Sequence, residues 1–181
     1  ECPHFGLCGG CSLQHQSSSA QIISKQEALL DALRDIGKVK PAEVLTPLVN
    51  TSPWGYRRKA RLGVKYVIKK ERVLVGFRER YGRFVADMQE CHVLDPRIAG
   101  QLESLAGLIG SMEGKRVIPQ IEVACGDTRC ALVFRHLEPL SADDQSLLRT
   151  FARDTGLAVV LQPGGPATVH CLEPAELELS V

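Results

Sequence analysis

Three cysteines near the start of the chain have the spacing of ligands to a metal centre. Cys2, Cys8 and Cys11 form a Cys-x5-Cys-x2-Cys pattern within a stretch rich in turn-forming residues. Glycines in this stretch let the backbone bend tightly and direct N–H groups towards bound sulfur. Three thiolates on one loop require a fourth, and we choose Cys91, because it follows a predicted strand and precedes a predicted helix start.

The kind of metal centre follows from the ligand type and the spacing. A site made only of thiolates selects zinc or an iron–sulfur cluster. Two paired Cys-x2-Cys units would favour a zinc ribbon, whereas one grouped triad with a distant fourth ligand favours [4Fe–4S]. The spacing therefore favours the cluster and leaves zinc as the alternative.

The other cysteines belong to no such pattern. The chain has seven cysteines, and an odd number without a secretory leader argues against a disulfide framework and for a reducing compartment. We interpret Cys125 and Cys130, which flank a predicted hairpin turn, as core or incidental residues, and Cys171 lies outside any motif.

Positive charge is concentrated in one segment of an otherwise acidic chain. Residues 57–83 hold eleven Lys and Arg against two Glu, while the formal net charge of the whole chain is only +1. Alternate residues of a predicted strand are basic, which places cations about 6.6–6.8 Å apart, close to the spacing of phosphates along RNA. A solvated strand face is the plainer explanation, but the charge concentration favours RNA binding. The candidate RNA-binding residues are Arg57, Arg58, Lys59, Arg61 and Lys65.

Hydrophobic periodicity predicts the elements that position these residues. The expected helices are Ile22–Ile36, Asp95 to Gly110 or Gly114, and Ser141 to Gly156. The expected strands are Arg57–Lys69, a return strand from Val73, Phe84–Met88, Ile118–Ala124, Arg129–Arg135, Leu157–Gln162 and Glu176–Val181. This order predicts an α+β fold: an antiparallel sheet of hairpins or a meander with helices largely on one side, plus a metal-binding Cys loop at the N-terminus.

The cysteines belong to a larger ordered set of motifs. The set is Cys2-Pro-x4-Cys8-Gly-Gly-Cys11-x2-Gln14-His15, then Trp54-Gly-Tyr56-Arg57-x-Lys59-x-Arg61-Leu62, then Gly76-Phe77, and finally Cys91-x-Val93-Leu94-x-Pro96. Over most of residues 1–112 it resembles the RNA 5-methyluridine methyltransferases, and most closely the iron–sulfur branch that acts on 23S rRNA. The resemblance implies that the four matched cysteines bind [4Fe–4S].

Enzymes of this family have a TRAM domain, a central cluster-bearing domain and a Rossmann-like methyltransferase domain that binds S-adenosylmethionine. The resemblance implies that residues 1–13 and 38–181 form the central RNA-binding domain, and that residues 14–37 form a helix that packs on the methyltransferase domain. The catalytic residues and the S-adenosylmethionine site would lie outside this chain, which has no glycine-rich cofactor loop of that type. The implied partner is 23S rRNA, and the implied full-length enzyme is a monomer.

Several function classes are disfavoured. No apolar run approaches the ~20 residues of a membrane helix, and the chain does not begin with a signal-peptide pattern, so we expect a cytoplasmic protein with no membrane partner. Because the first residue is Glu1 rather than Met, we expect a fragment of a longer protein. A ferredoxin-like electron carrier would lack the basic strand. The alternative to a methyltransferase part is a non-catalytic, zinc-stapled RNA-binding module.

Overall fold

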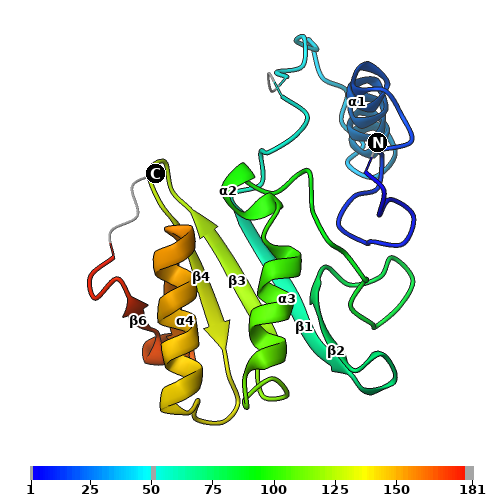
Figure 1. Cartoon of the computed structure of the whole chain (residues 1–181). Coiled ribbons are helices and arrows are strands. Elements are labelled where there is room, and N and C mark those ends of the chain that lie inside the picture. The colour runs from blue at the N-terminus through cyan, green and yellow to red at the C-terminus, as the bar shows by residue number, and fades with distance from the viewer. Residues whose placement is uncertain (1, 50–51, 178–181) are drawn as a thin grey trace.

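A six-stranded sheet forms the centre of the fold, with strand order β2-β1-β3-β4-β5-β6 (Figure 1). The computed structural model describes residues 2–49 and 52–177. The strands are β1 (Lys59–Val67), β2 (Arg72–Gly76), β3 (Gln120–Cys125), β4 (Cys130–Arg135), β5 (Ala158–Gln162) and β6 (His170–Glu173). The helices are α1 (Ser18–Asp35), α2 (Pro96–Ala99), α3 (Leu102–Ser111) and α4 (Ala142–Thr155), with 3-10 turns at Ile68–Lys70 and Pro166–Thr168.

The sheet is not wholly antiparallel, which corrects the prediction. Strands β4 and β5 pair in parallel, whereas the other neighbouring strands pair antiparallel. The reason is that α4 lies between β4 and β5 in the sequence and returns the chain to the end of the sheet where β4 began. The α+β class and the position of α3 and α4 on one face of the sheet agree with the prediction (Figure 1).

Three predicted elements differ from the structure. The segment Phe84–Met88, which is described throughout, forms only an isolated bridge from Val85 to Arg78 and no strand. The helix expected from Asp95 is divided into α2 and α3 at Gly100. Strand β6 was missed, since its four residues are too short to show a period, and most of the predicted strand Glu176–Val181 lies outside the described residues.

The core forms between the sheet and the covering helices because the strands alternate buried and exposed side chains. On β1, Leu62 and Val64 are buried while Arg61 and Lys65 are exposed, which confirms the predicted period of two. The helices bury one stripe each against this face. The largest fully buried side chains of the described residues are Phe134, Leu62, Leu94, Ile98, Leu102, Leu105, Ile109, Met112, Ile118, Ile121, Leu132 and Leu148.

Local capping explains the bounds of α4. The side chain of Ser141 accepts a hydrogen bond from the backbone N–H of Asp144, which satisfies one of the free donors at the helix start. Gly156 ends the helix in the left-handed region, with φ at 70°, where glycine carries no steric penalty. Both signals are local, and the sequence prediction of this helix is confirmed.

Helix α1 stands apart from the sheet and from α3 and α4 (Figure 1). None of its residues, all of which are described, is buried. Two of its apolar side chains, Ile23 and Leu29, are 55% and 60% exposed. Part of the apolar stripe is therefore open to solvent in the described part of this chain.

Candidate metal centre and basic surface

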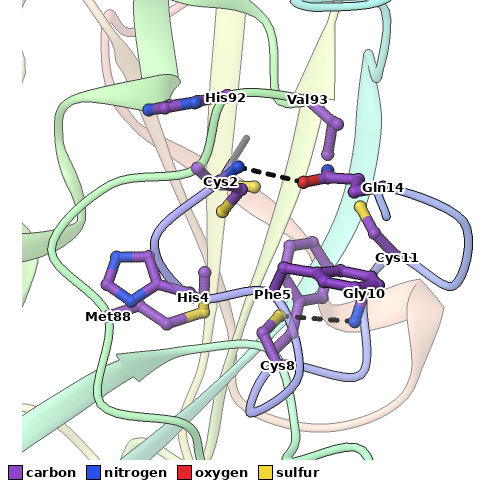
Figure 2. A pocket seen from close by; sticks show the side chains of 12 residues that line it. Cys2, His4, Phe5, Cys8, Gly10, Cys11, Gln14, Met88, His92 and Val93 are labelled. Carbon is purple, nitrogen blue, oxygen red and sulfur yellow. Dashed lines mark hydrogen bonds between the residues drawn. The ribbon is translucent and has the colours of Figure 1, made fainter. Parts of the chain in front are cut away.

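The four predicted ligands lie around one pocket. Cys2, Cys8 and Cys11 from the N-terminal loop line it (Figure 2). Cys91, from the segment before α2, lines it as well. The fold thus brings Cys91 to the N-terminal cysteines although the whole basic segment, residues 57–83, lies between them in the sequence. We call residues 2–11 the Cys loop.

Backbone hydrogen bonds attach the Cys loop to the segment after β2. Gly9 N donates to the Arg78 carbonyl at 2.8 Å, and Arg80 N donates to the Leu7 carbonyl at 2.8 Å. Cys8 pairs with Glu79 as an isolated antiparallel bridge. A larger residue could not replace Gly9 without a shift, because a Cβ would lie 3.0 Å from the Arg78 carbonyl oxygen. The glycine next to Cys8 is therefore required for this close approach.

Cys91 is held by the segments on either side of it. Its backbone N–H donates to the Ala99 carbonyl at 3.0 Å, and Asp95 N donates to the Arg57 carbonyl at 3.1 Å. Arg57 also connects the two halves of the site, since its Nη2 donates to the Gly10 carbonyl at 3.2 Å. Its guanidinium lies over the Phe77 ring, 5.3 Å from the ring centroid. Arg57 therefore braces the Cys loop against the sheet.

The thiols are placed where a cation would stabilise their charged forms. Burial raises the pKa of both Cys8 and Cys91, and neighbouring cysteines raise both further. Backbone N–H groups oppose this shift: Gly10 N lies 3.3 Å from Cys8 Sγ, and Val93 and Leu94 N–H groups act on Cys91. A cation bound between the cysteines would offset the desolvation of Cys8 and Cys91 and favour their thiolate forms.

His4 also lines the pocket, although no sequence pattern selected it. Its ring is buried and lines the same pocket (Figure 2). Within the described part of the chain, His4 Nε2 is buried with no hydrogen-bond partner. Such a buried polar atom is uncommon in proteins. A lone His in a Cys-rich loop gives no ligand spacing, so only the fold reveals it.

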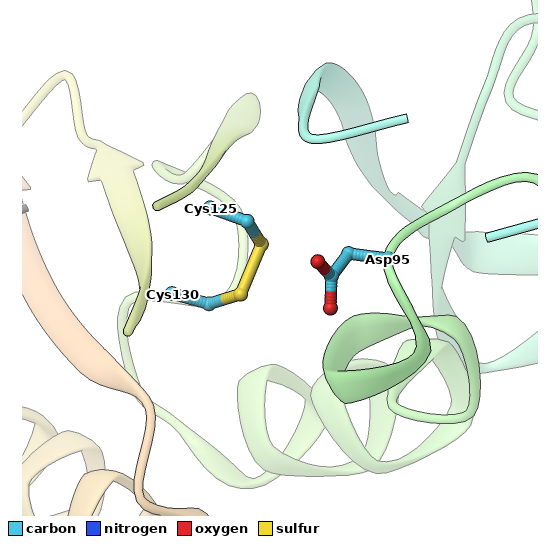
Figure 3. A group of neighbouring side chains, drawn as sticks. All are labelled: Asp95, Cys125 and Cys130. Atoms are coloured by element: carbon cyan, nitrogen blue, oxygen red, sulfur yellow. A yellow bond between two sulfur atoms is a disulfide. The ribbon is translucent and has the colours of Figure 1, made fainter. Parts of the chain in front are cut away.

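Cys125 and Cys130 lie in the buried core, as interpreted, but they are also bonded to each other, which the cysteine count did not lead us to expect. They form a disulfide across paired positions of β3 and β4 (Figure 3). Their sulfurs lie within 4.8 Å of an Asp95 carboxylate oxygen. In this state the sulfurs are bonded to each other and offer no thiolate to a metal. The odd cysteine count misled the prediction because only the strand register places these two side by side.

Asp95, together with Arg97, connects the segment that contains Cys91 to the β3–β4 turn. Its carboxylate receives two hydrogen bonds from the Arg97 guanidinium, each at 2.8 Å, and caps α2 by accepting from Arg97 N. Arg97 Nη2 also donates to the Gly126 carbonyl at 2.8 Å. The Arg97 guanidinium holds the pKa of Asp95 below its ordinary value of 3.8. This connection therefore requires the ionised carboxylate of Asp95.

Replacing Asp95 by Asn should lower the free energy of unfolding by about 2 kcal/mol at pH 7, or about 4–8 °C in Tm. Asn retains the cap but loses the charge that holds Arg97. Because the folded pKa is depressed, this stabilisation is fully present above pH 3.8 and disappears as the pH falls through the folded value. Thermal unfolding of both proteins between pH 7 and pH 3 measures it.

The control is Asp127→Asn. It removes a carboxylate that pairs with Arg58, and the Asp127 side chain is 57% exposed. Exposed pairs contribute about 0–1 kcal/mol, so its Tm should change little. If Asp95→Asn lowers Tm by the same amount at pH 7 and at pH 3, the proposed role of the Asp95 charge is wrong.

The predicted RNA-binding residues differ in whether they form ion pairs with acidic residues of the chain. Arg58 pairs with Asp127 at 2.5 Å and Arg61 with Glu122 at 3.2 Å. Lys59 and Lys65 are exposed and form no ion pair with the described residues. We call Lys59, Arg61 and Lys65 the basic face of β1, since all three lie opposite the buried residues of the strand. Arg57 and Arg58 are not part of this face. Arg57 hydrogen-bonds to the Gly10 carbonyl, and Arg58 pairs with Asp127.

Comparison with known proteins gives close relatives over nearly the whole chain. The chain is 52% identical over 176 residues to a 23S rRNA (uracil(1939)-C(5))-methyltransferase RlmD from Acidovorax sp. strain JS42, covering 95% of the chain and 36% of the relative. The proteins of the same name from Xanthomonas campestris and Alkalilimnicola ehrlichii are 51% and 54% identical, covering 99% and 93% of the chain and 40% and 38% of the relatives. The chain thus spans about two fifths of the length of these relatives. No family model matches it.

A solved structure has the same fold. It is the Pyrococcus abyssi tRNA (uracil-54, C5)-methyltransferase in complex with S-adenosyl-L-homocysteine, with a TM-score of 0.59 and 18% identity. The match covers 99% of this chain and 41% of that one. None of the helices among the described residues is long and apolar enough to cross a membrane.

Proposed function

We infer that this chain, a homologue of part of the 23S rRNA uracil-C5 methyltransferases, is the central part of such an enzyme. The support is an identity of 51–54% over at least 93% of the chain, with only about two fifths of each relative covered. The complete enzyme transfers a methyl group from S-adenosylmethionine to C5 of a uridine in 23S rRNA. It is cytoplasmic and acts as a monomer.

The part formed by this chain holds a [4Fe–4S] cluster through Cys2, Cys8, Cys11 and Cys91. The observation that carries this proposal is that these four thiols line one pocket. When bound, the cluster supplies a covalent staple between the Cys loop and the segment before α2. The chain's own residues orient it: N–H groups of Gly10, Val93 and Leu94 are directed at ligand sulfurs, and Arg57 braces the loop.

The basic face of β1 binds the RNA backbone. Lys59, Arg61 and Lys65 are exposed, and cations on one strand face can neutralise successive phosphates. Such contacts set affinity and position more than sequence choice. The chain therefore holds and orients folded rRNA, while methyl transfer takes place in another domain.

The remaining domains explain the unpartnered helix. Helix α1 exposes Ile23 and Leu29, and an exposed apolar stripe marks an interaction surface. We assign residues 14–37 to an interface with the enzyme's methyltransferase domain, which contains the catalytic residues and the S-adenosylmethionine site. A TRAM domain completes the enzyme. The chain itself holds neither the catalytic residues nor the cofactor site.

Anaerobic purification tests the cluster directly. We expect about four iron and four sulfide ions per chain and broad visible absorption that bleaches on oxidation. Stoichiometric zinc without sulfide would instead support a zinc-stapled RNA-binding module. In parallel, the complete enzyme should transfer labelled methyl groups to 23S rRNA, and failure to do so would reject the methyltransferase assignment.

A further inference from the structure

A second cavity lies beside the Cys loop and has no role in holding the cluster. Its volume is about 520 Å³, within the range of small-molecule sites. Gly9 and Gly10 of the Cys loop form one side, Arg61 and Gly63 of β1 form another, and residues 77–80 and 119–120 complete the wall. It therefore adjoins the basic face of β1.

Glycines contribute backbone to part of the cavity wall. A Cβ on Gly63 would lie 2.9 Å from Val85 Cγ2, and one on Gly10 would lie 3.1 Å from the Phe77 ring. Glycine at these positions lets the side chains of Val85 and Phe77 approach the backbone closely. A ligand in the cavity would thus contact peptide groups and planar side chains.

The charge of the lining favours an anion. Arg61, Arg78 and Arg80 line the cavity, and the acidic residue among the lining is Glu79. Glu79 lies against its own loop, since a Cβ on Gly82 would be 2.5 Å from Glu79 Oε2. Arg78 Nη1 donates to the Arg83 carbonyl and Arg61 Nε to Glu122. A guanidinium has five N–H donors, so both arginines retain donors for a ligand.

The loop that contains Arg78 and Arg80 also has exposed aromatic rings. The loop at residues 78–84 exposes Tyr81 and Phe84, at 91% and 63%. The Arg80 guanidinium lies 5.5 Å from the Tyr81 ring centroid, and that of Arg83 lies 5.7 Å from the Phe84 ring centroid. Aromatic rings interleaved with arginines stack unpaired bases of single-stranded RNA.

We propose that this cavity binds one unpaired nucleotide of the RNA. Arg61 contacts its phosphate, and its base stacks against the guanidinium planes of Arg78 and Arg80, beside the Tyr81 ring. The inference rests on the proposed function, since it names how RNA is held. The volume exceeds what a phosphate ion alone would need, and the guanidinium planes suit a flat base.

The test measures binding of a 23S rRNA fragment to the complete, cluster-containing protein. A series of RNAs carries an abasic sugar at one unpaired position each, so that the phosphate remains and the base is removed. At one position, removal of the base should weaken binding about tenfold or more. In the double variant Arg78→Ala/Arg80→Ala, this penalty should vanish, because the base no longer has a site.

Arg116→Ala/Arg153→Ala is the matched control, because it removes the same charge from exposed positions elsewhere. It should keep the full abasic penalty. Iron content and circular dichroism check that each variant folds. As a second measurement, 4-thiouridine at the sensitive position should cross-link to residues 77–81.

The outcomes separate this proposal from the proposed function. If RNA binds but the abasic penalty persists at every position in Arg78→Ala/Arg80→Ala, the nucleotide site is rejected and RNA binding stands. If that variant weakens binding of the intact RNA and of every abasic RNA by the same factor, the cavity contacts only phosphate. The proposal is then also rejected. If the complete protein does not bind the RNA at all, the proposed function falls with it.

Discussion

Replacing Cys8, Cys11 and Cys91 by Ser should abolish iron binding and lower Tm by about 8–16 °C. Removal of a metal site is among the changes that cost about 4 kcal/mol or more, and 1 kcal/mol corresponds to about 2–4 °C at this size. The structural reason is that the Cys loop joins residues 78–80 by a few backbone bonds. Its attachment to the segment before α2 depends on the shared centre. Iron analysis and calorimetry under anaerobic conditions measure both effects.

Two comparisons isolate the role of the centre. Cys171→Ser, a half-buried free thiol outside the Cys loop, should retain iron and Tm. Wild-type protein stripped of iron should unfold at the temperature of the triple variant, because Ser itself contributes little. If the iron-free protein keeps the stability of the loaded one, the centre is not a structural staple and a redox role is favoured.

Replacing Lys59, Arg61 and Lys65 by Ala should weaken rRNA binding by the complete enzyme about 100-fold at physiological salt. Each phosphate that the protein no longer neutralises reduces the slope of log K against log salt by about 0.7–0.9, so three such phosphates reduce it by about 2–3 units. Arg57 is left intact because it braces the Cys loop. Filter binding or fluorescence anisotropy across a salt series gives both quantities. The affinity for S-adenosylmethionine should not change.

The control replaces three exposed cations outside β1 by Ala, namely Arg34, Lys40 and Arg153. Its salt slope should equal that of the wild type. An unchanged salt slope in the Lys59/Arg61/Lys65 variant would show that the basic face does not contact phosphate. Arg61 would then serve only in its ion pair with Glu122 at 3.2 Å.

Local patterns in the sequence were sufficient for most elements. The alternation on β1, with Leu62 and Val64 buried, follows from the period of a strand, and the caps at Ser141 and Gly156 bound α4 through neighbouring atoms. The Cys-x5-Cys-x2-Cys spacing places three thiols on one loop because the chain between them is short. Such features depend on residues a few positions apart, so they can be predicted without the fold.

Contacts between distant segments were decided by the tertiary structure alone. The parallel pairing of β4 with β5 depends on how α4 crosses the sheet. The register of β3 and β4 places Cys125 beside Cys130, and the carboxylate of Asp95 is set against them by Arg97.

The surroundings of the candidate sites divide in the same way. The sequence alone determined which residue types are available: four cysteines, a basic strand and an amphipathic helix. Only the fold buried His4 beside the cysteines and turned Arg57 inward to the Cys loop. It also opened a cavity next to Arg61. Spacing along a chain constrains neighbours within a few residues, whereas packing of remote segments decides which side chains share a site.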